Sequence, residues 1–170
     1  MDGIIVIIGI VFLVAIAKKL FVLIFSFRET KFGFKGKLVY ADQGIRSKTF
    51  INKLFGIAAK PDFIFKIGKD SYKAVEYKGR NGKVYNSDIA QTKASVIAAR
   101  SKYNITHAVV HTDSCSQEID VNKPSKEIYS EIKELVDMTR DIKSKKVVTT
   151  CFPNKFKCRS CSMLSHCKFV

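Results

Sequence analysis

The stretch PDFIFKIGKDSYKAVEYK, residues 61–78, decides the fold predicted for this chain. It holds two runs rich in β-branched and aromatic residues, DFIFKI (62–67) and YKAVEYK (72–78), and between them lie Gly68, Lys69, Asp70 and Ser71. Two such runs separated by a short loop that contains glycine predict a β-hairpin. The stretch therefore predicts two antiparallel strands joined by a four-residue loop.

Outward from this hairpin, the pattern predicts both strands and helices. Strand, helix and strand over residues 72–112 can form a parallel crossover, so the predicted fold class is α/β, a mixed central β-sheet flanked by helices. One helix is expected to bury Ala90, Ala94, Val96 and Ile97, and the other Ile128, Ile132, Leu135 and Val136. The expected elements are strands at 36–42, 49–55, 62–67, 72–78 and 106–112 and helices at 88–102 and 123–146.

The hairpin also carries a group of charged residues with catalytic potential. Glu76 and Lys78 project from the same face of their strand, because side chains alternate along a strand. Asp62 begins the preceding strand, but a four-residue loop would set it opposite Tyr77, so a bulge or a bend at Pro61 is needed to turn it toward Glu76. Two carboxylates suit Mg²⁺ or Mn²⁺, and the lysine could orient or deprotonate a water. On spacing alone, an exposed Glu–Lys pair is the alternative.

Four of the five cysteines stand in the last twenty residues, in the pattern Cys151-x6-Cys158-x2-Cys161-x5-Cys167. Four thiolates this close together satisfy either a tetrahedral Zn²⁺ or a [4Fe–4S] cluster. The spacing does not separate these two possibilities. Cys115 competes with Cys151 for the fourth position. The two strand histidines, His107 and His111, are expected to be core or rim residues.

The first 27 residues form a segment of their own. From Gly3 to Ala17 there is no charge, and an apolar run continues after Lys18 and Lys19 as far as Phe27. Basic residues follow this segment, which by the positive-inside rule predicts a cytoplasmic body. The expectation is a transmembrane anchor at 1–27, hence a single-pass membrane protein with its C-terminal domain in the cytoplasm. A buried or interfacial helix is the alternative.

Composition narrows the class of protein. The chain has 170 residues, a formal net charge of +15 and 46% hydrophobic residues. It can bury a core, so it is not a disordered basic tail, and its charge indicates a polyanionic partner such as nucleic acid or an anionic membrane surface. Clustered cysteines in odd total number disfavour a secreted disulfide scaffold.

Several of these segments together resemble a known family. Asp62 after a proline, followed by Glu76-x-Lys78, is similar to the PD-(D/E)xK nuclease superfamily. The segments LVYADQG, AAKPDFIF, KAVEYKGR and SDIAQTKA, with the terminal cysteines, resemble RecB-like exonucleases of the CRISPR-associated four-cysteine type. The chain departs from that family in having no histidine in residues 1–60 and in carrying Ser95 where the family has a tyrosine.

The resemblance implies a restriction-endonuclease-like core and a set of site residues. Asp62 and Glu76 would be ligands of Mg²⁺ or Mn²⁺, Lys78 the catalytic lysine, and Gln91 a helix residue that reaches into the site. Gln91 also fits a capping box with Asp88. The resemblance favours a [4Fe–4S] cluster over Zn²⁺ on Cys151, Cys158, Cys161 and Cys167.

These expectations combine into one hypothesis with three segments. They are a membrane anchor at 1–27, a nuclease-like domain at 28–150 and a cysteine module at 151–170. The expected function is a membrane-anchored, metal-dependent deoxyribonuclease, an exonuclease acting on single-stranded DNA or DNA ends. The alternative is an inactive nuclease-fold protein that binds nucleic acid or acts as a membrane scaffold.

Overall fold

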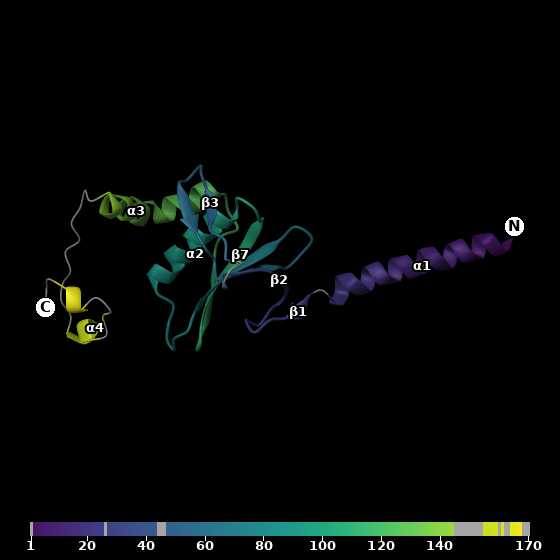
Figure 1. Cartoon of the computed structure of the whole chain (residues 1–170), viewed down its shortest axis with the longest axis horizontal. Helices are drawn as coiled ribbons and strands as arrows, with labels where there is room; N and C mark the ends of the chain where they lie inside the picture. Colours follow the sequence, from purple (N-terminus) through teal and green to yellow (C-terminus); the bar gives the residue numbers. More distant parts are fainter. Residues whose placement is uncertain are drawn as a thin grey trace. The chain divides into compact units, whose positions relative to one another are not determined.

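The computed structural model describes residues 2–25, 27–43, 47–144, 155–159, 161 and 164–167. The chain forms two compact units, residues 1–132 and 133–170. Figure 1 labels the helices α1 to α4 and the strands β1, β2, β3 and β7. The helices are α1 (Asp2–Phe25), α2 (Asn86–Ala99), α3 (Ser125–Lys143), α4 (Lys155–Arg159) and the short 3₁₀ helix η2 (Leu164–His166). The strands are β1 (Arg28–Glu29), β2 (Lys35–Ala41), β3 (Phe50–Asn52), β4 (Ile57–Ala59), β5 (Phe63–Lys66), β6 (Tyr72–Lys78), β7 (Ile105–Thr112) and β8 (Ser116–Ile119).

Six strands form a mixed sheet in the order β1-β2-β5-β6-β7-β8. β5 and β6 pair antiparallel as the predicted hairpin, whereas β6 and β7 pair parallel through the crossover helix α2. The prediction of a mixed α/β sheet with a parallel crossover over residues 72–112 is confirmed. A separate two-stranded sheet, β3–β4, contacts α2 as well, and Asn52 Nδ2 donates to the carbonyl of Ile97 (3.0 Å).

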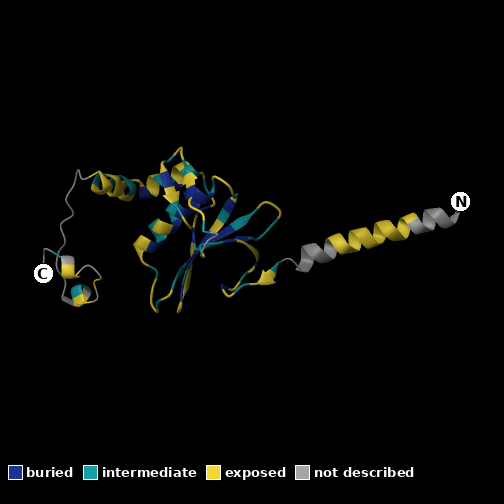
Figure 2. Ribbon diagram, in the orientation of Figure 1, coloured by how far each residue is buried: buried dark blue, intermediate teal, exposed yellow. Residues whose placement is uncertain are grey.

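The two faces of the sheet are covered differently. On the face that meets α2, Ile64, Ala74, Ala108 and Val110 are buried against the helix. Figure 2 shows buried residues concentrated where α2 meets the strands. On the other face the core cluster is Phe32, Phe65, Val75 and Val109, extended by Phe34, Phe63, Ile67 and Tyr77.

The buried face of α2 differs from the predicted apolar stripe. Val96 and Ile97 are buried as expected, but Ala90 and Ala94 are only half-buried, and the polar residues Asp88, Thr92 and Ser95 are buried instead. The small side chains let the helix approach the sheet closely. In α3, Ile128 and Ile132 are buried, whereas Leu135 is 49% exposed.

The predicted transmembrane anchor needs correction. Residues 2–25 do form a helix of 24 residues, and its side chains from Ile8 to Lys19 are exposed. Yet among the residues that the structure describes, none of the helices combines the length and apolarity needed to cross a membrane. Lys18 and Lys19 interrupt the apolar run, and the uncharged stretch before them spans about 22 Å, less than the roughly 30 Å of a hydrocarbon core. The predictions of a transmembrane segment at 1–27 and of a single-pass membrane location are therefore wrong.

Candidate functional site

The length of the hairpin connection decides where Asp62 lies. β5 ends at Lys66 and β6 begins at Tyr72, so the loop comprises residues 67–71, one residue more than the predicted four. The amide of Ile67 donates to the carbonyl of Ser71 (2.9 Å), which closes this longer loop. Phe63 pairs with Val75, and continuing the same register places Asp62 opposite Glu76. The expected mismatch with Tyr77 is therefore absent, and no bulge in β5–β6 is required.

Glu76, Lys78 and Gln91 form a closed set of hydrogen bonds. Lys78 Nζ lies 2.9 Å from Glu76 Oε1 and donates to Gln91 Oε1 at 2.8 Å. Gln91 Nε2 donates to Glu76 Oε1 at 2.5 Å. Glu76 and Lys78 come from the same face of β6, and Gln91 comes from α2, which packs on that face. The structure thus brings together three of the four predicted site residues by direct contact.

Asp62 joins them through the backbone of β6. Its Oδ2 accepts a hydrogen bond from the amide of Tyr77 (2.7 Å), and its carbonyl accepts one from the amide of Asp42 (2.8 Å). The Asp62 carboxylate is close enough to Glu76 to raise its pKa. All four predicted residues therefore lie at one end of the β5–β6 hairpin, beneath the first turns of α2.

Glu76 is the most buried of the charged residues in this site, with only 2% of its surface exposed. Burial raises the pKa of this carboxyl; the hydrogen bond from Lys78 opposes that rise, and the charge of Asp62 adds to it. One oxygen, Glu76 Oε2, is buried and has no hydrogen-bond partner within the described part of the chain. A buried carboxylate oxygen left unpaired costs free energy, because it has lost its water.

This unpaired oxygen fits a divalent cation. Mg²⁺ and Mn²⁺ prefer carboxylate oxygens, and Mg²⁺ commonly binds through one or two carboxylates, with water and substrate phosphate completing its shell. Asp62 and Glu76 offer that donor set. Among the described residues no group of three or more His, Cys, Asp or Glu side chains could hold a metal ion, so the part of the chain described here offers fewer than three such ligands to this site.

Gln91 does not cap its helix. Asp88 occupies the third position of α2 and accepts from the amide of Tyr85 (2.9 Å), so Asp88 does the capping that the sequence assigned jointly to Asp88 and Gln91. Asp88 also pairs with Arg80. This leaves Gln91 free to contact Glu76 and Lys78. Sequence reasoning missed the pairing of Arg80 with Asp88, because these residues lie eight positions apart across a loop and no local pattern joins them.

The cysteine module is only partly described, and Cys151 lies outside the described residues. Cys158, Cys161 and Cys167 are free thiols. The amides of Cys161, Leu164 and Cys167 donate to the carbonyls of Cys158, Cys161 and Leu164 (3.1–3.2 Å). The three described thiols are not gathered into a group that could hold a metal ion. The donor chemistry suits Zn²⁺ or an iron–sulfur cluster. Cys115 is also a free thiol, exposed beside Gly82.

The histidines of β7 lie in the strand beside β6, away from α2. His111 pairs in register with Tyr77, and its ring packs edge-on against Phe32 at 5.2 Å. His107 Nδ1 is hydrogen-bonded to Thr106 Oγ1 at 2.9 Å. Since the odd-numbered residues of β7 alternate with those facing α2, both histidines belong to the aromatic face rather than to the site.

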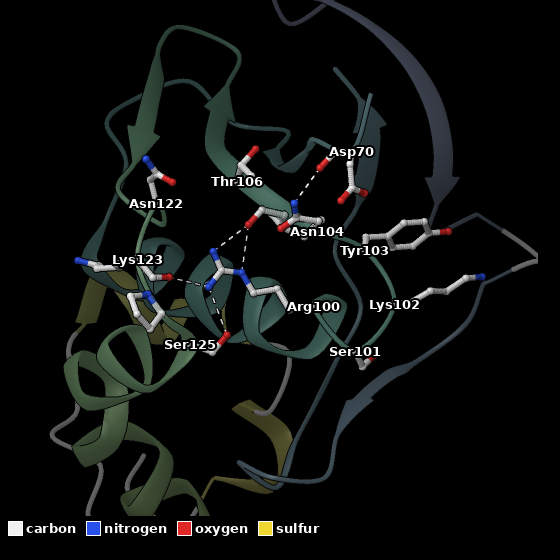
Figure 3. Close-up of a pocket in the computed structure, with 12 residues that line it drawn as sticks. Asp70, Arg100, Ser101, Lys102, Tyr103, Asn104, Thr106, Asn122, Lys123 and Ser125 are labelled. Atoms are coloured by element: carbon white, nitrogen blue, oxygen red, sulfur yellow. Dashed lines mark hydrogen bonds between the residues drawn. The ribbon is translucent and has the colours of Figure 1, made fainter. Parts of the chain in front are cut away.

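A pocket of about 710 Å³ lies away from these residues, at the other end of α2 (Figure 3). The Arg100 guanidinium in it donates to the carbonyls of Ile105 (2.8 Å) and Lys123 (2.8 Å), and to Val121 O (2.5 Å). A further bond reaches Ser125 Oγ (3.2 Å). Its donors are therefore committed to the chain, so Arg100 joins α2 to β7 and to the start of α3 rather than binding an anion.

Neither the models of known protein families nor the curated proteins compared with this chain give a match. A function for this chain therefore has to be argued from the geometry of the site.

Proposed function

We propose that this chain is a metal-dependent deoxyribonuclease that hydrolyses phosphodiester bonds, acting as an exonuclease on single-stranded DNA or DNA ends. The observation that supports it most is the buried Oε2 of Glu76, which has no hydrogen-bond partner in the described part of the chain, together with Asp62, which directly precedes the Phe63–Val75 pair. A lysine and a glutamine are held against the other oxygen of the same carboxylate. This combination has the parts needed for metal-assisted attack of water on a phosphate.

Asp62 and Glu76 would hold Mg²⁺ or Mn²⁺. When bound, the ion supplies charge neutralisation at the phosphate and a lowered pKa for bound water. The residues of the chain do the remaining work. Glu76 uses Oε1 to accept from Lys78 and Gln91, so Oε2 is the oxygen that would be available to a cation.

Lys78 and Gln91 would orient the attacking water. Lys78 is 20% exposed, so its ammonium group reaches the surface of the site, while Gln91 is exposed at the surface of α2. Gln91 Oε1 accepts from Lys78 Nζ and so fixes the direction of that ammonium group. A lysine positioned in this way can hold a water for attack and stabilise the charge that develops on the phosphate.

The net charge of +15 supports a nucleic-acid substrate. Phosphate contacts by lysine and arginine provide most of the affinity of such proteins, and this affinity falls with added salt. Lys83, Lys60 and Arg80 belong to loops that flank Asp62 and Lys78 in sequence. The proposed substrate strand would therefore approach over a basic surface.

The test is incubation of the full chain with end-labelled single-stranded DNA and Mn²⁺, with EDTA as the metal-free control. We expect Mn²⁺-dependent release of nucleotides by the wild type and none by Glu76→Gln. Glu118→Gln is the matched control, because Glu118 is an exposed glutamate of β8 paired with Lys73. Full cleavage by Glu76→Gln would overturn the proposal. DNA binding without cleavage in Mn²⁺ would instead indicate an inactive nucleic-acid-binding protein.

We further propose that the four C-terminal cysteines, Cys151, Cys158, Cys161 and Cys167, hold a [4Fe–4S] cluster, with Zn²⁺ as the alternative. What supports this is the spacing of the four cysteines within residues 151–167 and the free state of the three described thiols, although these three are not gathered into a metal-holding group in the structure. Binding of such a group would stabilise the segment, because metal binding and folding are coupled in small sites. Anaerobically purified protein should be brown and contain acid-labile sulfide. Colourless protein with one zinc ion per chain would favour zinc and exclude the cluster.

A further inference from the structure

An exposed aromatic ring with a guanidinium beside it stands next to the proposed site. Tyr85, the residue that precedes α2, is 49% exposed. The guanidinium carbon of Arg80 lies 4.9 Å from the centroid of its ring, and Lys83 Nζ lies 5.9 Å from the same centroid. An exposed tyrosine ring adds little to the packing of the core. With two cations beside it, the ring offers a stacking face for a nucleobase and positive charge for its phosphate.

The loop that carries these residues is rigidly held. Gly82 has a φ of +125°, a conformation that favours glycine. Its amide donates to Ser114 Oγ (2.8 Å), and its carbonyl accepts from Thr112 Oγ1 (2.8 Å). These bonds tie the tip of the loop to the turn between β7 and β8. A base that stacked here would meet a surface already in place, which lowers the entropic cost of binding.

The loop is also fixed to the site itself. Arg80 follows Lys78 by two residues, and its amide donates to the Lys78 carbonyl at 2.6 Å. Its guanidinium pairs with Asp88, and the same Asp88 carboxylate accepts from the amide of Tyr85. Tyr85 and Arg80 therefore sit between the strand that carries Lys78 and the helix that carries Gln91.

We propose that Tyr85 and Arg80 form a stacking platform for one unpaired base of single-stranded DNA, close to the bond that is cut. The inference rests on the proposed nuclease function and adds the residues that select the form of the substrate. Bases of a duplex are stacked on their neighbours, so only an unpaired base can present its face to Tyr85. The platform would thus favour single strands and frayed ends over intact duplex.

The probe is a thymidine oligonucleotide about 12 nucleotides long in which 2-aminopurine replaces one base at each position in turn. Binding is measured in EDTA, so the signal does not depend on cleavage. Since 2-aminopurine loses fluorescence on stacking, we expect quenching at one position. Tyr85→Phe, which keeps a ring, should retain the quenching, and Tyr85→Leu should abolish it and weaken binding by roughly 5- to 150-fold. Affinity for a duplex should change little.

Two further variants separate stacking from charge and from structure. Arg80→Lys keeps a cation for Asp88 but loses the planar group, so it should weaken the quenching. Lys102→Ala removes the cation that lies 5.3 Å from the ring of Tyr103, after the other end of α2, and should leave the quenching unchanged. Equal quenching by Tyr85→Leu and the wild type would overturn the inference while leaving cleavage intact. Quenching that depends on Tyr85, without cleavage in Mn²⁺, would instead overturn the proposed activity alone.

Discussion

The backbone amide of Tyr77 donates a hydrogen bond to Oδ2 of Asp62 over 2.7 Å, across the β5–β6 hairpin. The main chain of the strand that carries Glu76 and Lys78 thus fixes the carboxylate contributed by the neighbouring strand. Because the donor is a backbone group, exchange of the Tyr77 side chain does not remove it. The spacing between the two carboxylates is consequently a property of strand pairing.

Divalent metal should stabilise the protein through Glu76 and Asp62. A ligand that binds only the folded state raises the free energy of unfolding with its concentration. We expect Mn²⁺ to raise the thermal unfolding midpoint of the full chain, and Glu76→Gln or Asp62→Asn to abolish that rise. Differential scanning fluorimetry measures the shift. An undiminished shift in Glu76→Gln would show that the ion binds elsewhere, and Glu118→Gln is the control that should behave as the wild type.

Lys78 and Gln91 should affect turnover more than metal binding. Lys78→Ala is expected to lower the single-turnover cleavage rate by about 10²- to 10⁴-fold, the usual range for a proton-transfer group. Gln91→Leu should lower it by about 10- to 100-fold, because Gln91 acts by holding Lys78 and Glu76. The Mn²⁺-induced thermal shift should persist in both. Lys93→Ala, a change on the same helix in a residue paired with Glu131, should leave the rate near that of the wild type.

Replacing Glu76 and replacing Glu131 by glutamine should change the free energy of unfolding at neutral pH in opposite directions. Burial raises the pKa of Glu76 above its ordinary 4.5, with Lys78 opposing and Asp62 adding to the rise. The folded state therefore binds the Glu76 proton more tightly than the unfolded state does. The stabilisation that results is fully present below pH 4.5 and is lost as pH rises through the raised pKa. In metal-free buffer, Glu76→Gln should then be more stable than the wild type at neutral pH, and the difference should shrink toward pH 4.5.

Glu131 is the internal comparison for that experiment. The hydrogen bond from Lys123, followed by that from Lys93, lowers the pKa of Glu131 below 4.5. Its stabilisation is present above pH 4.5 and is lost as pH falls through the lowered pKa. Glu131→Gln should therefore lower stability at neutral pH by a small amount, because the pair is partly exposed. Urea unfolding across pH measures both variants, and changes of the same sign would contradict the argument.

Replacing Arg100 should lower the free energy of unfolding without altering the candidate site. Its removal leaves the carbonyls of Val121, Lys123 and Ile105 without their donor. We expect Arg100→Met to lower the free energy of unfolding by about 3 kcal/mol, since several charge-assisted hydrogen bonds are lost together. Lys102→Met, an exposed neighbour two residues along, should cost little. A loss below that of Lys102→Met would contradict the role assigned to Arg100.

The central hairpin and crossover could be predicted because their residues carry strong local signals. The strand at 72–78 has the predicted bounds, and the parallel pairing of β6 with β7 follows from the strand–helix–strand order. The predicted pairing register of the hairpin was wrong by one position, because of a single residue. The high strand propensity of Ile67 predicts that it ends the strand, but its amide donates to the Ser71 carbonyl, so Ile67 belongs to the loop. Loop closure overrode side-chain propensity there.

Other elements gave little signal. The predicted strand at 49–55 contains β3 and then a turn, and β4 follows at Ile57–Ala59, too short to show an alternating pattern. β8, with the sequence SQEI, has only one buried residue, because it is an edge strand. At the site, the residue types were readable from the sequence, whereas the contact of Gln91 with Glu76 depends on the angle at which α2 crosses β6. Capping by Asp88 shows how a local pattern can point to the wrong partner.

The position of β6 in the sheet determines when the site is lost during unfolding. β6 is an interior strand, paired with β5 on one side and β7 on the other, and Glu76 and Val75 are buried on its two faces. Amide protons in such a strand exchange with solvent only when most of the domain opens. Fraying at the ends of the chain therefore leaves the two carboxylates in register, and the site persists intact until cooperative unfolding removes all of it at once.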